Sequence, residues 1–416
     1  MITESPDLLS AIRARFAHID SCPFEGPRVF FENAGGALTL NSVVQTSGAY
    51  AGYPDNQGRD NPASKALMAA IAKGKADARL FFNASSGQVF VGESGTEVLF
   101  RLIRTAALAA GEGGILLGST LEHPASRSAM HRWAEVTGRT HVQVAHDDVS
   151  GTVTAEAYRQ HITPDVRVAS IVQTSPVTGI SVDVQAIVAE IRVVAPECFI
   201  IVDGIQHASH GHIDIDAYGI DGFAVSPYKV FSRHGYGIGW ASDRLTAATK
   251  ETVIGGAAEN WEQGTRDAGS YATFSDVVDY FDWLGGEVSD ATERRARIEA
   301  AAGAIHDQEQ ALCTAMMQGT GSHRGLAHIP GVTVIAGADN PDREGVVCLT
   351  LDGMAAGDLV SHLRAHGVRT HIRHNDHYCG NVLTPLGIEA CVRVSFSHYN
   401  SMEEVGQFLQ AMNAAV

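Results

Sequence analysis

Residues 198–240 decide the fold: CFIIVDGIQHASHGHIDIDAYGIDGFAVSPYKVFSRHGYGIGW. The first apolar run, residues 199–202, ends in Asp203. The second, residues 222–225, leads into the sequence SPYK, which ends at Lys229. Short apolar runs bounded by turn residues are typical of buried strands, and the carboxyl ends of parallel strands meet at one edge of a sheet. This stretch therefore predicts a parallel sheet with an Asp and a Lys at its carboxyl edge.

Asp203 and Lys229 at one edge match the needs of one cofactor, pyridoxal phosphate. A lysine forms a Schiff base with its aldehyde, and a carboxylate keeps the pyridinium nitrogen protonated so that the ring draws off electrons. For an isolated pair, a surface lysine and an aspartate with ordinary partners are the more frequent arrangement. The remaining strand ends must decide between these interpretations.

Length and composition indicate an ordinary globular protein. The chain has 416 residues, 45% of them hydrophobic and 19% charged, which favours one large and one small domain. The net charge of −17 argues against a nucleic-acid partner or an anionic membrane surface. No apolar run approaches the roughly 20 residues of a membrane helix, and the first residues have no signal-peptide pattern.

The cysteine and histidine patterns indicate neither a disulfide framework nor a metal site. The six cysteines contain no Cys-x-x-Cys pair, which fits the reducing cytoplasm. The 19 histidines show no ligand spacing, so we expect no metal.

Strand and helix patterns alternate through the first part of the chain. Strands are predicted at 88–92, 114–117, 140–144, 166–173, 199–203, 222–225 and 237–241, and helices at 96–110, 124–137, 155–161 and 184–194. Helices between strands supply the right-handed crossovers that parallel strands need. The pattern predicts an α/β fold with a seven-stranded, mainly parallel sheet and helices on both faces.

The flanking segments suggest further units. We expect one amphipathic helix over the first ~25 residues, a strand and small-residue turn at 29–36, and a helix at 63–82 with Ser64 as a possible cap. An irregular loop at 255–269 precedes a long helical segment at 271–318, with a break at Gly285-Gly286 and a solvated charged face at 291–310.

The C-terminal part alternates strands with helices and predicts a smaller α+β domain. The strands are expected at 332–335, 346–351 and 392–397, and the helices at 355–366 and 402–412. The expected organisation is an N-terminal segment, 1–45, that packs with the small domain, a large cofactor-binding domain, 46–260, and the small domain, 261–416.

Three other strand ends carry polar residues at the expected edge. Gly95-Thr96 lies at a strand–helix junction, where an anion could bind, although an ordinary helix cap explains it too. His123 could stack on a flat ring or simply start a helix before a proline. The hydroxyls near Ser175 could face the same edge or belong to a turn.

Arginine and cysteine residues of the last domain raise further candidates. Arg393 lies in an apolar strand and needs an anionic partner, either a substrate carboxylate or a protein acid. Cys379 is a possible reactive thiol or an ordinary loop cysteine. Arg59, Arg369 and Arg373 could bind a second anionic group or be solvated surface residues.

Taken together, these motifs resemble the class V aminotransferase-like enzymes that use pyridoxal phosphate, especially the cysteine desulfurase and selenocysteine lyase branch. DGIQHA at 203–208 resembles the family's Asp-x-x-Gln, and SPYK at 226–229 stands where it has Ser-x-His-Lys. The segments ENAG (32–35), GTE (95–97), EH (122–123) and QGT (263–265) and Arg393 with YN (399–400) are similar to its other motifs. The resemblance implies the fold of pyridoxal phosphate transferases of type I.

The resemblance also implies roles for single residues. Lys229 would form the Schiff base and move the substrate α-proton, Asp203 would pair with the ring nitrogen, and His123 would stack on the ring. The implied cofactor-binding residues are Gly95, Thr96, His123, Ser175, Asp203, Gln206, Ser226, Tyr228, Lys229 and, from the neighbouring subunit of a homodimer, Thr265. The implied substrate-binding residues are Asn33, Ala34 and Arg393.

Two departures from the family's pattern bear on the reaction. Tyr228 replaces the usual His before the lysine, and His374-Asn375 stands where desulfurases carry their sulfur-accepting Cys, five residues before Cys379. We expect a cytoplasmic enzyme that acts on a small amino acid by β-elimination or C–S cleavage, with transamination or epimerisation as the alternative. A non-catalytic binding protein of the same fold is the alternative from another class. The polar loops at 53–61 and 371–380 are expected to select the substrate.

Overall fold

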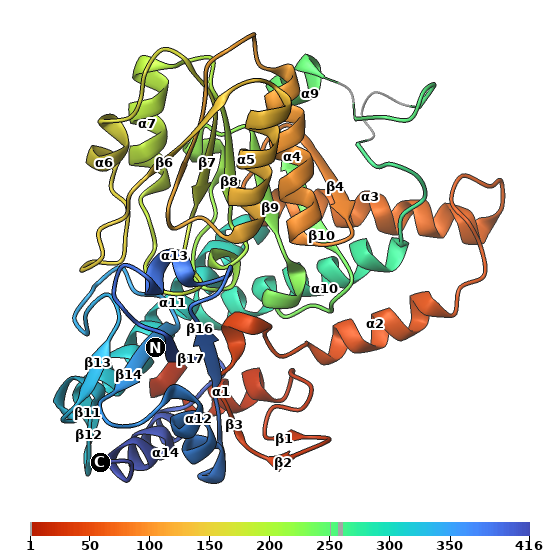
Figure 1. Cartoon of the computed structure of the whole chain (residues 1–416). Helices are drawn as coiled ribbons and strands as arrows, with labels where there is room; N and C mark the ends of the chain where they lie inside the picture. Colours follow the sequence, from red (N-terminus) through yellow and green to blue (C-terminus); the bar gives the residue numbers. More distant parts are fainter. Residues whose placement is uncertain (1, 250, 257–260) are drawn as a thin grey trace.

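The computed structural model describes residues 2–249, 251–256 and 261–416. Its centre is a seven-stranded sheet, shown in Figure 1. The strands lie in the order β4 (Gln88–Gly92), β10 (Gly237–Ala241), β9 (Gly222–Val225), β8 (Phe199–Asp203), β7 (Val166–Val172), β5 (Ile115–Ser119) and β6 (Thr140–Val144). All neighbours pair in parallel except β10, which is antiparallel to β4 and β9. The predicted fold class is confirmed.

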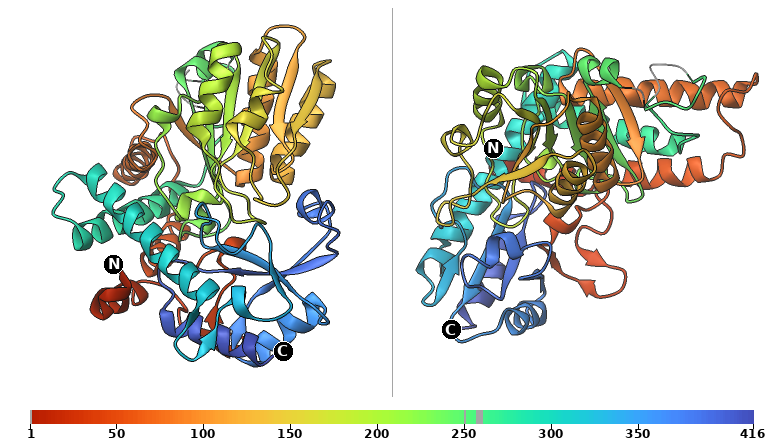
Figure 2. Two further views of the ribbon diagram at one scale, coloured as in Figure 1. Left: turned by 90° about the vertical axis from the view of Figure 1, so that its left-hand side faces the viewer. Right: turned by 45° about the horizontal axis from the view of Figure 1, so that its top comes forward.

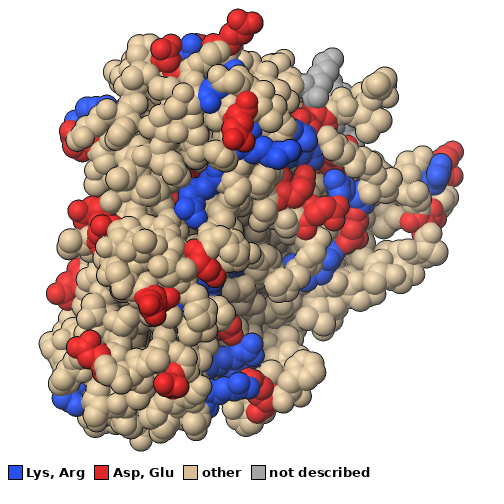
Figure 3. Space-filling view, in the orientation of Figure 1, with Lys and Arg blue, Asp and Glu red and all other residues tan. Residues whose placement is uncertain are grey.

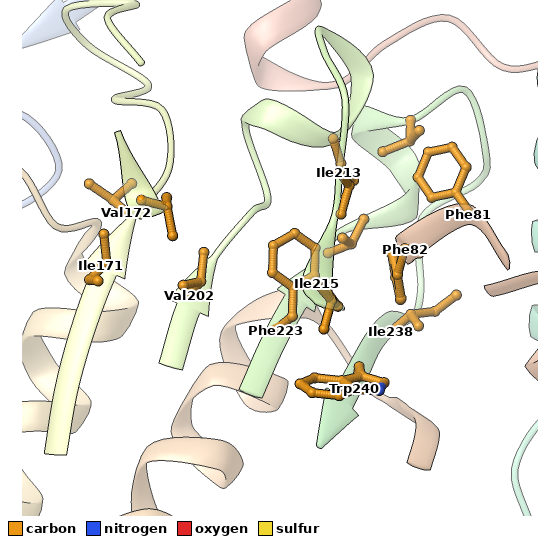
Figure 4. Close-up of a cluster of buried hydrophobic side chains, with 14 of the residues drawn as sticks. Phe81, Phe82, Ile171, Val172, Val202, Ile213, Ile215, Phe223, Ile238 and Trp240 are labelled. Atoms are coloured by element: carbon orange, nitrogen blue, oxygen red, sulfur yellow. The ribbon is translucent and has the colours of Figure 1, made fainter. Parts of the chain in front are cut away.

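Helices bury both faces of this sheet. On β8, Ile200 and Val202 point to a core formed with α3 (Pro62–Phe82) and α7 (Val184–Val194), whereas Ile201 points to a core on the side of α4 (Gly95–Ala109) and α5 (Pro124–Val136). Figure 4 shows part of the first core, with Phe82 and Phe223 among the rings. Because both faces are covered, the strands are near-continuous apolar runs.

The N-terminal segment differs from the prediction. The helix expected over the first ~25 residues is wrong, because α1 (Pro6–Arg13) ends early and a bridge joins Phe16 to Leu40. Phe16 packs edge-on against Phe231, which holds this segment on the large core instead of in a helix. A helix that the pattern did not predict follows, α2 (Asn41–Ala51), and Asn61 rather than Ser64 caps α3.

The predicted helix break at Gly285-Gly286 is also wrong. The first helix, α10 (Ala268–Val288), runs through both glycines, and the second, α11 (Arg294–Gln318), begins after Glu293. A Cβ on Gly285 would overlap the backbone of Arg297. Glycine here therefore permits close packing of two helices rather than a kink. The predicted loop at 255–269 lies partly outside the described residues, at 257–260.

The C-terminal part forms a second, smaller sheet. Its order is β13 (Val332–Val334), β14 (Val346–Leu351), β17 (Ala390–Ser395) and β16 (His371–His374), all antiparallel, with α12 (Ala356–Ala365) and α14 (Met402–Asn413) packed against it. A short strand, β15 (Val368–Arg369), pairs in parallel with β3 (Val29–Phe30). The two views in Figure 2 show this lobe beneath the large one.

The apolar packing links the predicted units. Phe16 and Leu40 belong to the large core, whereas Val29 and Phe31 belong to the small one. Helix α11 joins the two cores, since Ile305 lies in the first and residues from Leu312 onward lie in the second. The domain limits 1–45, 46–260 and 261–416 stay a prediction. No helix within the described residues is long and apolar enough to cross a membrane.

Candidate active site

One cavity at the carboxyl edge of the large sheet collects the predicted residues. Asp203 is the last residue of β8, and Lys229 ends the 3-10 turn that follows β9. Parallel neighbours place both side chains at the same edge. Seven of the predicted residues line this cavity: Thr96, His123, Asp203, Gln206, Ser226, Tyr228 and Lys229.

The amine of Lys229 is set for nucleophilic chemistry. Its Nζ donates to Oε1 of Gln206 at 3.1 Å. Burial, aided by the positive charge of Arg393 and opposed by Asp203, lowers the pKa of Lys229 to about 7. A large fraction of this amine is therefore neutral at neutral pH, and a neutral amine can attack an aldehyde.

Asp203 is a buried carboxylate without an arginine partner. Its Oδ1 accepts the backbone N–H of Ile205 at 3.0 Å. Burial raises the pKa of Asp203 to about 6, against the lowering effects of that hydrogen bond and of Lys229. The carboxylate still ionises at neutral pH and can pair with a cation, such as the pyridinium group of a bound ring.

His123 offers a neutral aromatic face to the cavity. It stands at the N-cap of α5, where its Nδ1 accepts the backbone N–H of Ala125 at 3.1 Å. Burial, followed by the charge of Lys229, lowers the pKa of His123 to about 3. The ring thus stays neutral across the working pH range, which suits stacking on another flat ring.

An anion fits where three backbone segments converge. Helix α4 starts at Gly95, and a Cβ there would overlap the hydroxyl of Ser226. Gly237, at the start of β10, packs closely against Gly95, because a Cβ added to Gly237 would stand 2.5 Å from the backbone nitrogen of Gly95. Free N–H groups and the helix dipole make this junction a cradle for a phosphate group.

Four other predicted residues lie away from the cavity lining. The hydroxyl of Ser175 accepts the backbone N–H groups of Val177 and Thr178, so it belongs to a turn. Of the hydroxyl residues near Ser175, it is the neighbouring Thr174 that lines the cavity. Asn33 and Ala34 bond to Ser395 of β17, and exposed Thr265 borders a separate recess with Tyr50 and Tyr53.

Arg393 is a buried cation that lacks an acidic partner. Its Nη1 donates to the carbonyl of Pro176 at 3.2 Å, and its Nε is buried without a hydrogen bond. Burial lowers the pKa of Arg393. Within the described part of the chain, no carboxylate lies within ion-pair distance of it. Of the two partners that the sequence left open, the protein acid is therefore absent.

Cys379 is buried beside an arginine. Its Sγ accepts Nε and Nη2 of Arg373 at 2.9 and 2.7 Å. Burial raises the pKa of Cys379, although Arg373 opposes this. The thiol is thus protonated at neutral pH, which does not favour a reactive thiolate.

A hydrogen-bonded chain leads from Lys229 through Gln206 and His210 to Glu309, and the sequence did not predict it. Gln206 contacts His210 at 3.1 Å, and Nδ1 of His210 lies 2.7 Å from Oε2 of Glu309. A second pair, His207 with Glu344 at 2.5 Å, is buried beside it. Glu309 lies in the segment 291–310, for which a solvated face was predicted, yet it is buried. Glu309 is buried together with its partner His210, which lies far away in the sequence.

The fold and the site define a pyridoxal phosphate-dependent enzyme of fold type I. Its residues fit the cofactor, since the cavity joins a phosphate cradle, a buried carboxylate and a lysine of lowered pKa. The chain belongs to the family described as Aminotransferase class-V, whose sequence model matches residues 29–408.

Known proteins of similar sequence and structure are named cysteine desulfurases or desulfurase-like. A probable cysteine desulfurase of Vibrio cholerae is 23% identical, with 98% of each chain covered. The cysteine desulfurase-like protein ustD of Aspergillus flavus is 25% identical over 94% of this chain and 88% of its own length. The solved structure of the Escherichia coli cysteine desulfurase CsdA superposes with a TM-score of 0.79 at 21% identity, with 98% of each chain covered.

Proposed function

We propose that this enzyme cleaves a bond at the β-carbon of a small amino acid, by β-elimination or C–S cleavage, through Lys229. The observation that carries the proposal is the pairing of a lysine of pKa about 7 with a buried carboxylate in one cavity. Its relatives' names add support. When bound, pyridoxal phosphate supplies an electron sink for the carbanion at Cα.

Each residue of the site has a proposed role in binding or in proton transfer. Lys229, whose pKa burial lowers to about 7, would hold the cofactor and accept the proton that leaves Cα. Asp203 would keep the cofactor's ring nitrogen protonated, and His123 would cover the ring. Arg393 would bind the α-carboxylate, because its charge is buried, its Nε makes no hydrogen bond, and no carboxylate within the described residues pairs with it. Gly95, Thr96 and Ser226 hold the phosphate.

Transamination and epimerisation share these first steps and are the alternatives. Buried, protonated Cys379 does not support a persulfide route in this conformation. We further propose a cytoplasmic homodimer in which Thr265 reaches the cofactor of the neighbouring subunit. The exposed position of Thr265 outside its own cavity supports this arrangement.

The test is product analysis with a panel of amino acids. The purified protein is incubated with L-cysteine and other small amino acids, and sulfide, pyruvate, keto acids and D-isomers are measured. We expect elimination products, which Lys229→Ala abolishes. Asp203→Asn should retain the cofactor on Lys229 but lower the rate on the order of 100-fold, because the ring nitrogen loses its anionic partner.

Other outcomes would separate the alternative reactions or contradict the proposal. A keto acid or D-isomer as the sole product would establish one of the alternatives. Sulfide release that persists in Cys379→Ala would exclude the persulfide route. A protein that stays colourless with added pyridoxal phosphate would contradict the catalytic function altogether.

A further inference from the structure

Three arginines near the cavity lack acidic partners in an acidic protein. The chain has 47 Asp and Glu against 30 Lys and Arg, and acidic and basic side chains are interspersed over the face in Figure 3. Arg369, for example, bonds Glu32 at 2.7 Å. Across residues 2–249, 251–256 and 261–416, however, no carboxylate lies within 4.0 Å of a charged nitrogen of Arg127, Arg373 or Arg393.

The small sheet places two of these arginines on one face. Arg373 of β16 pairs with Cys391 of β17, and Arg393 follows two residues later on β17, so both arginines share this face. The opposite face carries Val392 and Val394, which build the small core. The face with the arginines therefore turns toward the large domain and the cavity.

The third arginine approaches through the loop after β16. Nη2 of Arg127, in the first turns of α5, donates to the carbonyl of His377 at 3.0 Å, and its Nε is buried without a hydrogen bond. The guanidinium carbon of Arg373 lies 5.8 Å from the ring centre of the next residue, Tyr378. The ring centres of Tyr378 and His123 are 6.0 Å apart. His123 lines the cavity, so this loop joins both arginines to it.

Within the described residues, this loop holds no acid that forms an ion pair with Arg373. Its Nε and Nη2 contact Cys379, a thiol whose pKa burial raises and which therefore carries no charge at neutral pH. The carboxylate of Asp376 accepts the backbone N–H of Tyr378 and makes no ion pair with Arg373. The pKa of Asp376 is lowered, against burial, by the backbone N–H groups of Tyr378 and Cys379 and by the charge of Arg373. The positive charge of Arg373 also contributes to the lowered pKa of Lys229, which shows that its field reaches the reacting amine.

We propose that Arg373 and Arg127 form a second anion subsite beside Arg393, and that the substrate is an amino acid whose side chain ends in a carboxylate. The inference rests on the proposed function for one point, that Arg393 takes the α-carboxylate. A half-buried guanidinium that forms no ion pair favours a carboxylate ligand over an isosteric amide. Of the three arginines that the sequence suggested for a second anion, Arg373 has this setting, whereas Arg369 is paired and Arg59 is exposed.

Calorimetry with unreactive ligands tests the subsite without turnover. Succinate has two carboxylates, and succinamate replaces one of them by an amide of the same shape. For the pyridoxal phosphate-loaded protein we expect succinate to bind at least about tenfold more tightly, as for a charge-assisted hydrogen bond. Arg373→Gln should abolish this preference, and Arg373→Lys should retain part of it.

Matched variants separate charge from loop packing. Arg132→Gln removes an exposed arginine from the same helix as Arg127 and should leave the preference for succinate unchanged. Cys379→Ser removes the sulfur contact and should leave it unchanged as well. Equal affinity for the two ligands in the unmodified protein, or an unchanged preference in Arg373→Gln, would overturn the subsite.

A reaction assay distinguishes failure of this inference from failure of the proposed function. Exchange of the Cα proton in D₂O is followed by NMR for two pairs, L-aspartate with L-asparagine and S-carboxymethyl-L-cysteine with L-cysteine. Faster exchange of the acid in each pair supports the subsite. If the neutral amino acids exchange equally fast and Arg373→Gln has no effect, the subsite is wrong and the proposed function stands. If no amino acid exchanges, the proposed function fails.

Discussion

At Lys229, the charge of Asp203 opposes the combined effect of burial and of Arg393 on the pKa of one amine. Loss of water and the charge of Arg393 disfavour the ammonium form, whereas Asp203 favours it, and the balance lowers the pKa to about 7. Residue type alone would give an amine with a pKa near 10.5. The reactivity of Lys229 is thus a property of its position at the sheet edge.

This shift predicts the pH dependence of cofactor capture. Only the neutral amine reacts, so the rate at which the cofactor-free protein attaches pyridoxal phosphate should rise with pH, reach half its limit near pH 7 and then level off. The attached fraction is fixed with borohydride and measured by mass spectrometry. Nα-acetyl-lysine is the control, and its rate should still rise above pH 9. A protein rate that follows the control would contradict the lowered pKa.

At the scale of elements, glycines decide how closely backbones approach. Gly285 of α10 faces the backbone of Arg297 in α11, whereas a Cβ on Gly286 would meet nothing closer than the side chain of Arg297 at 3.8 Å. Two adjacent glycines in one helix therefore have different consequences. Gly285 is required for the close packing of the two helices, whereas Gly286 only weakens its own helix.

The two glycines give a matched pair of substitutions. Gly285→Ala should lower the free energy of unfolding by about 1–3 kcal/mol, because the helices must move apart. Gly286→Ala should leave it unchanged or raise it by up to ~1 kcal/mol, because alanine favours the helix. Urea unfolding followed by circular dichroism measures both. Equal effects of the two substitutions would show that the close helix contact is not the cause.

At the scale of the whole molecule, the proposed dimer would complete each site from two chains. Thr265 lies outside the cavity of its own chain, whereas Lys229 lies in it. If Thr265 serves the neighbouring subunit, a Lys229→Ala chain paired with a Thr265→Glu chain forms one intact site and one doubly altered site.

Mixed dimers test this arrangement. Each variant is expected to be inactive as a homodimer, because one lacks the lysine and the other places a negative charge against the phosphate. Heterodimers isolated with two different tags should regain about half of the activity of the unmodified dimer, since one of two sites is intact. Heterodimers as inactive as the homodimers would place Thr265 and Lys229 in the same site, and monomers in solution would exclude the dimer.

Local patterns predicted much of the fold. The strands at 88–92, 140–144, 199–203, 222–225 and 237–241 were predicted with the bounds that the structure has. For the central strands 199–203 and 222–225 the reason is a continuous buried apolar run. The N-terminal helix and the break at Gly285-Gly286 were wrong, because contacts with Phe231 and Arg297 override local preference there.

The amino-acid pattern alone was enough to predict the sheet, its carboxyl edge, and Asp203 and Lys229 at that edge. These features depend on periodicity and chain order, which are local. Three features depend on the folded chain: β10 runs antiparallel, Glu309 is buried against His210, and Arg127 and Arg373 contact the same loop, at His377 and Cys379. Such contacts join residues far apart in the chain, and their energies depend on burial and on neighbouring charges, which a linear pattern does not contain.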